Sequence, residues 1–428
     1  MSIRPVHSAE PLVTQFPVTA VSPEKAQQPE NWAARQLAGL VALDFALGFA
    51  LLWDRFPLPV VGQPAGILVV GLVILLGTTR RPTHVLRHQY LIIGLYVLML
   101  AAAIVVSQIN GLDWVQRSVK MVILLLFGLT IAVGRVHLRS LLAGLTVGLL
   151  ANVAFYYAGL TSDNYPPYLT GFLGDKNVAG LIYATFLVAG LVVYRARWAQ
   201  ITHIIVMAVA LGLTGSRTSM AAGVTALIWV ALRNRLPLLG RLVLGGVLIW
   251  VLGVVERQFA RIGLFADRED TDWFREQIQI ATELKVANAP WFGEGLTTAW
   301  VLIDGRRFMW FHDSYAAMRI EGGWIMIAVM TVLVGLFGLG LLHRGRVGQP
   351  LLIAEGAFVA VLVCAWQLGE VFFTTPAFLV LGMAWRLRLG QPVNPLRTPG
   401  TAVPTATPVE VLPPDLTAET VMPRKEGA

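Results

Sequence analysis

Charge and cysteine are what this chain has least of. Only 14% of its 428 residues are charged, whereas 56% are hydrophobic, and its mean hydropathy is +0.66. So few charges cannot cover the surface of a soluble protein, so the composition predicts an integral membrane protein. The single cysteine, Cys364, lies in an apolar run, so no internal disulfide can form and no thiol redox chemistry is indicated.

Several motifs are also missing. There is no HExxH, no DxD-type carboxylate cluster, no cysteine pair and no glycine-rich nucleotide loop, so we expect neither a metal nor a cofactor. The net charge of +8 does not indicate nucleic acid, because arginines in predicted cytoplasmic loops, where they touch anionic lipids, supply much of it. Residues 1–31 are polar and contain prolines, which predicts a cytoplasmic tail and no cleavable signal peptide.

Apolar runs long enough to cross a membrane recur from Trp32 to about Trp385. Each has roughly 17 to 25 residues, the length a helix needs to cross about 30 Å of hydrocarbon. We count about twelve, and predict an all-α transmembrane bundle over residues 32–389. The approximate centres are Ala46, Val69, Val97, Leu126, Leu149, Phe186, Met207, Ala226, Leu248, Val332, Val361 and Leu379.

The basic residues predict how this bundle is oriented. Cytoplasmic loops retain arginine and lysine, and here every second connection is basic, so both termini are expected in the cytoplasm. The segment from 390 to 428 is rich in proline and threonine and reads as a disordered cytoplasmic tail. The basic connections contain Arg80, Arg81, Arg87, Arg135, Arg139, Arg195, Arg197, Arg233, Arg235, Arg241, Arg344, Arg346, Arg386 and Arg388.

A long segment, 256–314, falls on the outer side and mixes charges of both signs. A solvated, salt-bridged loop is the plain interpretation, because long loops are translocated despite positive charge. Within it, however, residues 273–286 repeat apolar side chains at helical spacing, which predicts a helix in the membrane interface that covers the outer mouth of the bundle. Those side chains are Trp273, Phe274, Ile278, Ala281 and Leu284.

The stretch RRFMWFHDSYAAMRIEGGW, 306–324, places ionisable residues at the start of an apolar helix. If the helix begins near His312, then His312, Tyr315 and Arg319 share one face, and Glu321 projects from another. A guanidinium two turns into a membrane helix costs about 2 to 3 kcal/mol unless it is paired or faces water, so this face is expected to line a cavity. Taken alone, His312 is better explained as an interfacial histidine that hydrogen-bonds a backbone carbonyl.

Two other outer sites carry a cation. Arg217 occupies a tight turn between two spans, where it either snorkels to the surface or binds a ligand. Lys176 begins a helix, where the dipole disfavours a cation while free amides favour an anion, so it either extends into water or helps bind an anionic ligand. Together these residues predict an anionic substrate bound at the outer membrane surface, with cations doing the electrostatic work of a metal.

Four patches, GFLGDKN, TGSRTS, REQIQIATELKVANAPWFGEG and HDSYAAMRIEGG, resemble motifs of the O-antigen ligase and polymerase superfamily. This superfamily also contains exopolysaccharide polymerases and bacterial protein O-oligosaccharyltransferases. The patches run in order from about Gly171 to Gly323, all on the predicted outer side. The chain departs from the family pattern at Asp313, where asparagine is usual, at Gln279, where tryptophan is common, and at Gly322, where an apolar residue is usual.

The resemblance implies a GT-C-like glycosyltransferase of the bacterial inner membrane whose site faces the periplasm. Its donor would be a polyprenyl (undecaprenyl)-pyrophosphate-linked glycan, and no metal would be needed. Arg217 and Arg275 would hold the pyrophosphate, and His312 would accept the proton of, or orient, the acceptor hydroxyl. The further substrate-binding candidates are Lys176, Asn177, Tyr315, Arg319 and Glu321.

The acceptor is left open at this point. The GDKN and SRT patches look more like a polymerase of exopolysaccharide or O-antigen, whose acceptor is another lipid-linked glycan. A ligase that uses lipid A-core is a close alternative, and protein glycosylation is a distant third. A transporter or flippase is the rival from another class, because about twelve spans suit many carriers. Asp44 and Asn152 are its isolated polar candidates within spans, and no internal repeat supports it.

Overall fold

A computed structural model describes residues 41–53, 65–161, 165–259 and 269–393, without the side chains of 65, 249–259 and 269–272. The described chain is mostly helical. Its helices are α2 (Ala42–Ala50), α3 (Ala65–Thr78), α4 (Gln89–Ile109), α5 (Val115–Ala132), α6 (Leu138–Tyr157), α7 (Lys176–Ala189), α8 (Arg197–Leu213), α9 (Arg217–Leu232), α10 (Leu238–Phe259), α11 (Glu269–Asn288), α12 (Ser314–Thr331), α13 (Gln349–Ala365) and α14 (Thr375–Leu389). Two short antiparallel pairs join β1 (His84–Leu86) to β4 (Gly390–Pro392) and β2 (Trp300–Ile303) to β3 (Arg307–Trp310).

Every centre predicted for a membrane span lies in a helix. One of them, Val332, begins a π-helical turn, Val332–Gly338, that continues α12. Five described helices are long and apolar enough to cross a bilayer: Gln89–Ile109, Val115–Ala132, Leu138–Tyr157, Lys176–Val193 and Ser314–Gly338. The multi-pass membrane class therefore agrees with the structure, while the count of twelve spans and the GT-C-like fold stay predictions.

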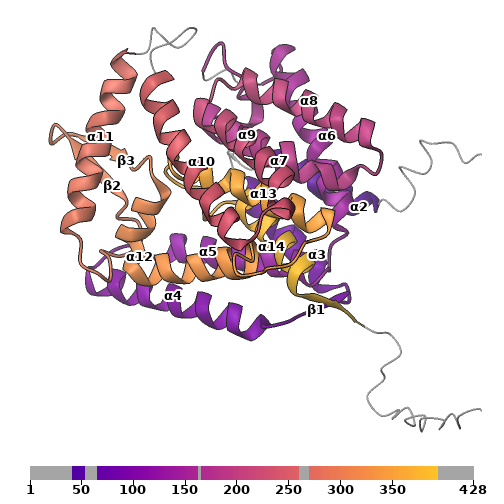
Figure 1. Ribbon diagram of the computed structural model, residues 1–428. Coiled ribbons are helices and arrows are strands. Elements are labelled where there is room, and N and C mark those ends of the chain that lie inside the picture. The colour runs from indigo at the N-terminus through magenta and orange to yellow at the C-terminus, as the bar shows by residue number, and fades with distance from the viewer. Residues whose placement is uncertain (1–40, 54–64, 162–164, 260–268, 394–428) are drawn as a thin grey trace, which may run out of the picture.

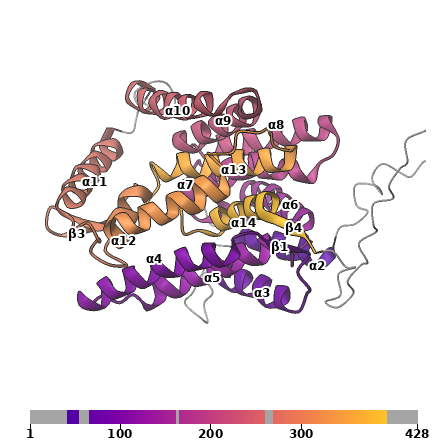
Figure 2. The same ribbon diagram turned by 60° about the horizontal axis from the view of Figure 1, so that its bottom comes forward.

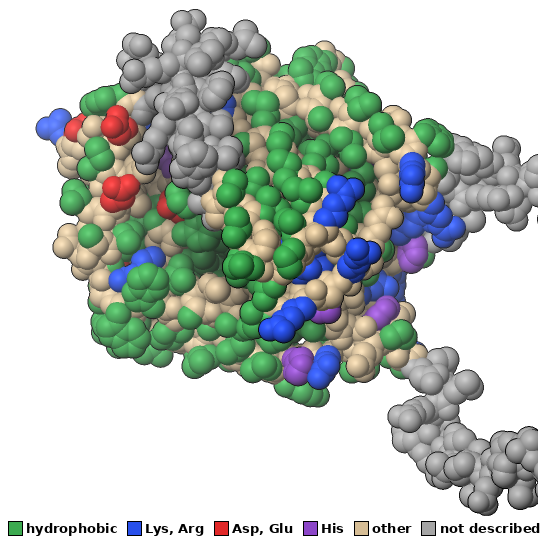
Figure 3. Space-filling view, viewed as in Figure 1, with side chains coloured by type: hydrophobic (Ala, Val, Ile, Leu, Met, Phe, Trp, Pro, Cys, Tyr) green, Lys and Arg blue, Asp and Glu red, His purple; other side chains and the backbone are tan. Residues whose placement is uncertain are grey.

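The two ends of the bundle differ in charge. Acidic side chains gather around α11, and basic side chains gather at the opposite end, where β1 and the start of α8 lie (Figures 1 and 3). At the basic end, Asp44 accepts two hydrogen bonds from Arg80, at 2.6 and 2.8 Å. Deeper in the same end, buried Glu355 pairs with Arg233 at 2.8 Å and with Arg388. Three of the arginines predicted to lie on the inner side, Arg80, Arg233 and Arg388, therefore form ion pairs within the protein.

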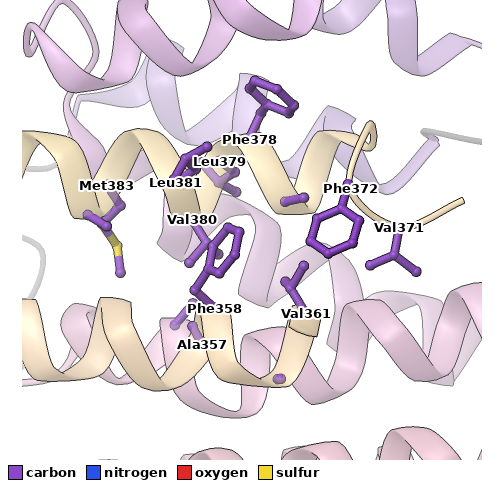
Figure 4. Packing of buried hydrophobic residues seen from close by; sticks show 14 of the residues in the cluster. Ala357, Phe358, Val361, Val371, Phe372, Phe378, Leu379, Val380, Leu381 and Met383 are labelled. Atoms are coloured by element: carbon purple, nitrogen blue, oxygen red, sulfur yellow. The ribbon is translucent and has the colours of Figure 1, made fainter. Parts of the chain in front are cut away.

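The core lies between α13, α14 and their neighbours α5, α7 and α9. Phe358 of α13 faces Val380 of α14 across it, while Phe378 points to the other side of α14, toward Gly128 of α5 (Figure 4). Helices α13 and α14 bury apolar side chains nearly all round, as central helices of a bundle do. The outer helices behave differently, and α4 exposes a row of large apolar side chains where lipid would lie.

Close helix approach depends on glycine between α2 and α6. A Cβ on Gly48 would overlap the carbonyl oxygen of Leu141, and one on Gly144 would overlap that of Phe45. Small residues at such crossings allow membrane helices to pack by van der Waals contact, because lipid provides no hydrophobic drive between them.

The segment predicted as a tail begins with ordered structure. Gly390–Pro392 forms β4 and pairs with β1, and the amide of Val393 donates to Thr83 at 3.0 Å. The prediction that disorder starts at residue 390 is therefore wrong for these first residues. The proline-rich composition of the segment gives no sign of β1, a strand partner about 300 residues away. The remainder of the predicted tail and all of residues 1–31 lie outside the described residues.

Two features shape the outer end. Helix α11 runs crosswise to α4 over the end of the bundle, and includes the helix expected at 273–286 (Figure 1). Helix α12 breaks at Gly323, whose φ of 64° and ψ of −158° interrupt the helix. The half before the break runs crosswise and the half after it follows the direction of α4 (Figures 1 and 2).

Candidate functional site

The site starts at the first residues of α7. Asp175 caps this helix, because its carboxylate accepts from the amides of Asn177 at 2.8 Å and Val178 at 3.1 Å. We expected these amides to be free for an anionic ligand. That expectation was wrong at both amides, since the carboxylate of Asp175 already occupies them. Lys176 begins the helix as predicted, and its Nζ lies 4.9 Å from the ring centre of Tyr168.

The start of α9 lies directly beside the start of α7. A Cβ on Gly180 of α7 would come within 2.8 Å of the Cβ atoms of both Ser216 and Ser219. In the turn before α9, Gly215 has φ of 63° and packs on the ring of Tyr168, the same ring that Lys176 contacts. Arg217 is the first residue of α9, so the two predicted cations, Lys176 and Arg217, begin neighbouring helices.

His312 lies just before α12, which starts at Ser314 rather than at the histidine itself. Asp313 caps α12 by accepting from the amides of Tyr315 at 2.7 Å and Ala316 at 3.2 Å. An aspartate caps a helix as well as an asparagine does, so Asp313 is suited to this helix start. The cap also keeps His312 outside the helix, so it does not share the helical face expected for Tyr315 and Arg319.

Charges from two other elements act on the His312 imidazole. Desolvation lowers the pKa of His312, the positive charge of Arg275 on α11 lowers it further, and the carboxylate of Asp175 partly opposes them. The imidazole is therefore neutral at pH 7 and can accept a proton. The carboxylate that raises this pKa belongs to Asp175, which we had not predicted as a site residue; its position before Lys176 at a helix start was the available signal.

The structure thus places Arg275 and Asp175 close enough for their charges to act on His312, and places Lys176 and Arg217 at the starts of neighbouring helices. In the space-filling view, a hollow with mostly hydrophobic walls lies between the surfaces of α11 and α10 (Figure 3). Asn177 lies at the same helix start as Lys176, with its side chain partly buried. Within the described residues, no three histidine, cysteine, aspartate or glutamate side chains are arranged to hold a metal.

The break in α12 is filled by the segment that follows α11. The amide of Glu294 donates to the Ile320 carbonyl at 2.6 Å, and the amide of Trp324 donates to the Trp291 carbonyl at 2.9 Å. Gly293 and Gly323 lie at the contact, where added Cβ atoms would overlap the opposite backbone. The glycines of the PWFGEG and EGG motifs therefore let two backbones meet and satisfy the polar groups that the break exposes.

Arg319 and Tyr315, predicted to bind substrate, make contacts within the protein. Arg319 donates to the carbonyls of Pro290 at 2.8 Å and Ala289 at 3.0 Å, just after α11 ends. The Tyr315 hydroxyl donates to the Leu362 carbonyl at 3.1 Å. Backbone carbonyls therefore pair the Arg319 guanidinium, as its position in the helix requires. These contacts account for both residues without a ligand, and their role in substrate binding stays a prediction.

Glu321 also has protein partners. Its carboxylate accepts from Arg117 Nη2 at 2.8 Å and from the amide of Thr297 at 3.1 Å. Arg117 also pairs with Glu370, which pairs with Lys120 at 2.8 Å. Sequence reasoning missed Arg117 and Lys120. Both lie in the first turns of α5, at the end predicted to face outward, and two cations there oppose the positive-inside rule, which was a usable signal.

This ion-pair cluster lies next to the catalytic candidate. The backbone at Gly369 packs directly on Phe311 and comes close to His312. Ser314 ties the same loop to α12, because its hydroxyl donates to the Leu368 carbonyl and accepts from the amide of Val371 at 3.0 Å. The loop before α14 and the charged cluster therefore hold the backbone on which His312 is mounted.

Comparisons with known proteins give no independent assignment. A scan against models of protein families found no match to this chain, and a search of curated proteins found no similar sequence. The likeness to the O-antigen ligase and polymerase superfamily therefore rests on the four patches themselves and enters only as a proposal.

Proposed function

We propose that the protein transfers a glycan from a polyprenyl-pyrophosphate carrier to an acceptor hydroxyl on the outer side of the bacterial inner membrane. The observation that supports the proposal is that the charge of Arg275 acts on His312, while Lys176 and Arg217 begin neighbouring helices at the end predicted to face outward. A neutral base next to cations suits a reaction that deprotonates a hydroxyl and releases an anion.

In the proposed step, the acceptor oxygen attacks the anomeric carbon of the donor. The bond from that carbon to the pyrophosphate oxygen breaks, and polyprenyl pyrophosphate leaves with both electrons of the bond. The acceptor proton passes to the neutral imidazole of His312. Arg217 and Arg275 neutralise the charge that develops on the leaving pyrophosphate, for which the guanidinium fork is suited.

The positive charge of Arg275 serves both halves of this scheme. It stabilises the leaving anion, and by lowering the pKa of His312 it keeps the base neutral. Since His312 precedes the capped first turn of α12 while Arg275 is carried by α11, the substrate would have to reach residues of both elements. A polyprenyl carrier would approach them from the bilayer.

The acceptor is proposed to be another lipid-linked glycan, which makes the protein an exopolysaccharide or O-antigen polymerase. Transfer to lipid A-core, the reaction of an O-antigen ligase, is the alternative within the same chemistry. The transporter hypothesis is weakened because its two candidate residues have structural roles. Asp44 binds Arg80 and the amide of His137, and Asn152 accepts from the amide of Phe172 at 2.8 Å.

Purified protein in lipid nanodiscs, incubated with a polyprenyl-pyrophosphate-linked glycan with and without lipid A-core, tests the proposal. A product ladder from donor alone indicates a polymerase, and a product that requires the core lipid indicates a ligase. Activity is expected to persist in EDTA, because arginines supply the positive charge. Absence of product with every donor and acceptor, combined with glycan movement across vesicles, would favour the transporter.

Variants sharpen this test. Arg217→Ala and Arg275→Ala are expected to abolish transfer while the protein still folds, and lysine at either position restores it poorly because it lacks two-point geometry. His312→Ala is expected to be severely impaired at neutral pH. Arg344→Gln, an exposed arginine in an inner connection, is the matched control and keeps full activity. Wild-type rates in the Arg275 variant would remove the pyrophosphate role assigned to it.

A further inference from the structure

The hairpin of β2 and β3 has two unlike faces. Val301 and Ile303 point inward and are buried in one cluster with Ile278 of α11. The opposite face points away from this cluster and is also apolar. Leu302 is 51% exposed, Phe308 is 47% exposed and Trp310 is 56% exposed, and the ring of Trp300 lies 4.7 Å from that of Phe308.

A second exposed aromatic group lies where the PWFGEG segment meets the break in α12. Trp291 and Trp324 are joined by a backbone hydrogen bond, and both side chains point into the open, with 63% and 58% exposure. Phe292 packs edge-on against Trp291. The guanidinium of Arg319 lies 5.2 Å from the ring centre of Trp324. This group sits at the start of the half of α12 that follows the direction of α4.

Hydrogen bonds fix the base of the hairpin to the outer ends of α4 and α5. The amide of Leu296 donates to Ser107 Oγ at 2.7 Å, and Asn110 Nδ2 donates to the Glu294 carbonyl at 2.8 Å. Ile109, in the last turn of α4, is 78% exposed on a helix long enough to cross the membrane. The aromatic groups therefore stand at the level where the lipid-facing surface of α4 ends.

We propose that both apolar groups sit in the interface of the outer leaflet. The hairpin group consists of Trp300, Leu302, Phe308 and Trp310. The second group, called the joint because it lies where the PWFGEG segment meets the break in α12, consists of Trp291, Phe292 and Trp324. Tryptophan prefers this zone because its ring is apolar while its N–H can bond to headgroups and water. Arg306, at the exposed hairpin tip, supplies positive charge for lipid phosphates, whereas the guanidinium of Arg307 lies 5.8 Å from the ring centre of Phe274 on α11. The proposal does not depend on the enzymatic activity.

A glycan stacked on the same aromatics is the competing occupant. Sugar hydroxyls need carboxylate, amide or other polar groups to fix their orientation, whereas the outward strand positions are all apolar. Beside Trp300, Lys285 and Glu294 are paired with each other at 3.3 Å. That face also lies beside the apolar end of α4, and Arg306 at the hairpin tip matches anionic headgroups. These observations favour lipid over carbohydrate.

The inference relocates the membrane contact that the sequence assigned to α11. Phe274, Ile278 and Ala281 of that helix face the hairpin, so the α11 face expected to enter the interface is partly buried by protein. The hairpin and the joint would make the lipid contact instead, and α11 would pack on the hairpin. The height of Arg275 above the bilayer is then set by the hairpin.

Site-specific fluorescence quenching in nanodiscs tests this placement. Phe308→Cys and Leu302→Cys are each labelled with bimane, since native Cys364 is buried and does not react in the folded protein. We expect several-fold stronger quenching by a nitroxide on lipid headgroups than by aqueous iodide. Glu276→Cys, at an exposed position of α11, is the matched control and is expected to show the opposite preference.

Quenching of both hairpin labels by iodide alone would overturn the proposal. If added oligosaccharide then protected them from iodide, the face would be a glycan platform instead. A second measurement uses the same label without the tip charge: Arg306→Gln should reduce the preference of the hairpin label for anionic over neutral lipid quenchers. An unchanged preference would show that the tip does not reach the headgroups.

Discussion

The substitution Glu321→Gln separates a structural role for this residue from a role in substrate binding. Its carboxylate is 3% exposed and accepts from Arg117 and from the Thr297 amide, which lie on other elements. Glutamine keeps the size and one acceptor oxygen but loses the charge. A hydrogen bond to a charged group contributes about 1.5 to 3 kcal/mol. We therefore expect Glu321→Gln to lower the free energy of unfolding by about that amount.

The partner substitution Arg117→Gln should cost more. It leaves Glu321 buried without its cation, and breaking such a pair from one side typically costs about 3 to 5 kcal/mol. The 15% exposure of Arg117 and the 34% exposure of Glu370 reduce this toward the lower end. The double variant should be less destabilised than the sum of the two, because neither charge is then left alone.

Unfolding of the protein in mixed micelles, followed by circular dichroism as denaturing detergent is added, measures these differences. Glu276→Gln on the exposed surface of α11 is the control and should change stability by less than about 0.5 kcal/mol. If Glu321→Gln were as stable as the native protein yet lost glycan transfer, Glu321 would act on substrate and the structural assignment would be refuted.

Three further predictions concern other parts of the chain. Gly323→Ala should destabilise the protein by at least about 1 to 3 kcal/mol in thermal melts, since φ is positive there, whereas Gly212→Ala, with open space around it, should not. Asp175→Asn keeps the helix cap but removes a charge that raises the pKa of His312; that pKa should fall, so the acid limb of the activity profile should move to lower pH, and a shift to higher pH would contradict this sign. Glu355→Gln should destabilise the basic end by about 3 to 5 kcal/mol in the same melts, because two arginines then lose their buried counter-ion, and an unchanged melting temperature would count against that pairing.

Much of the helical framework follows from local sequence. Apolar length placed each predicted span centre in a helix, because a chain in lipid must satisfy its amides internally. The helix starts at Lys176 and Arg217 were also predictable, since short polar residues precede them. The helix at 273–286 followed from its periodicity, although not the face that it buries.

Pairings between distant segments were not predictable. Arg117 and Glu321 are 204 residues apart, and nothing near either one names the other. Adjacent glycines at 322 and 323 permit a helix break, but the break exists because residues 291–294 supply the missing backbone partners. For the same reason we predicted Arg319 to bind substrate, and nothing in the sequence indicated that it donates to carbonyls of a neighbouring segment.

The sequence by itself determined that this is a membrane protein, which apolar runs become helices and which connections are basic, because length, hydropathy and capping act over a few residues. Only the tertiary structure decided which charges meet: that Arg275 and Asp175 both act on His312, while Glu321 is taken by Arg117. The reason is that the energy of a charge in a membrane protein depends on its nearest partner, and that partner comes from whichever helix the packing brings alongside.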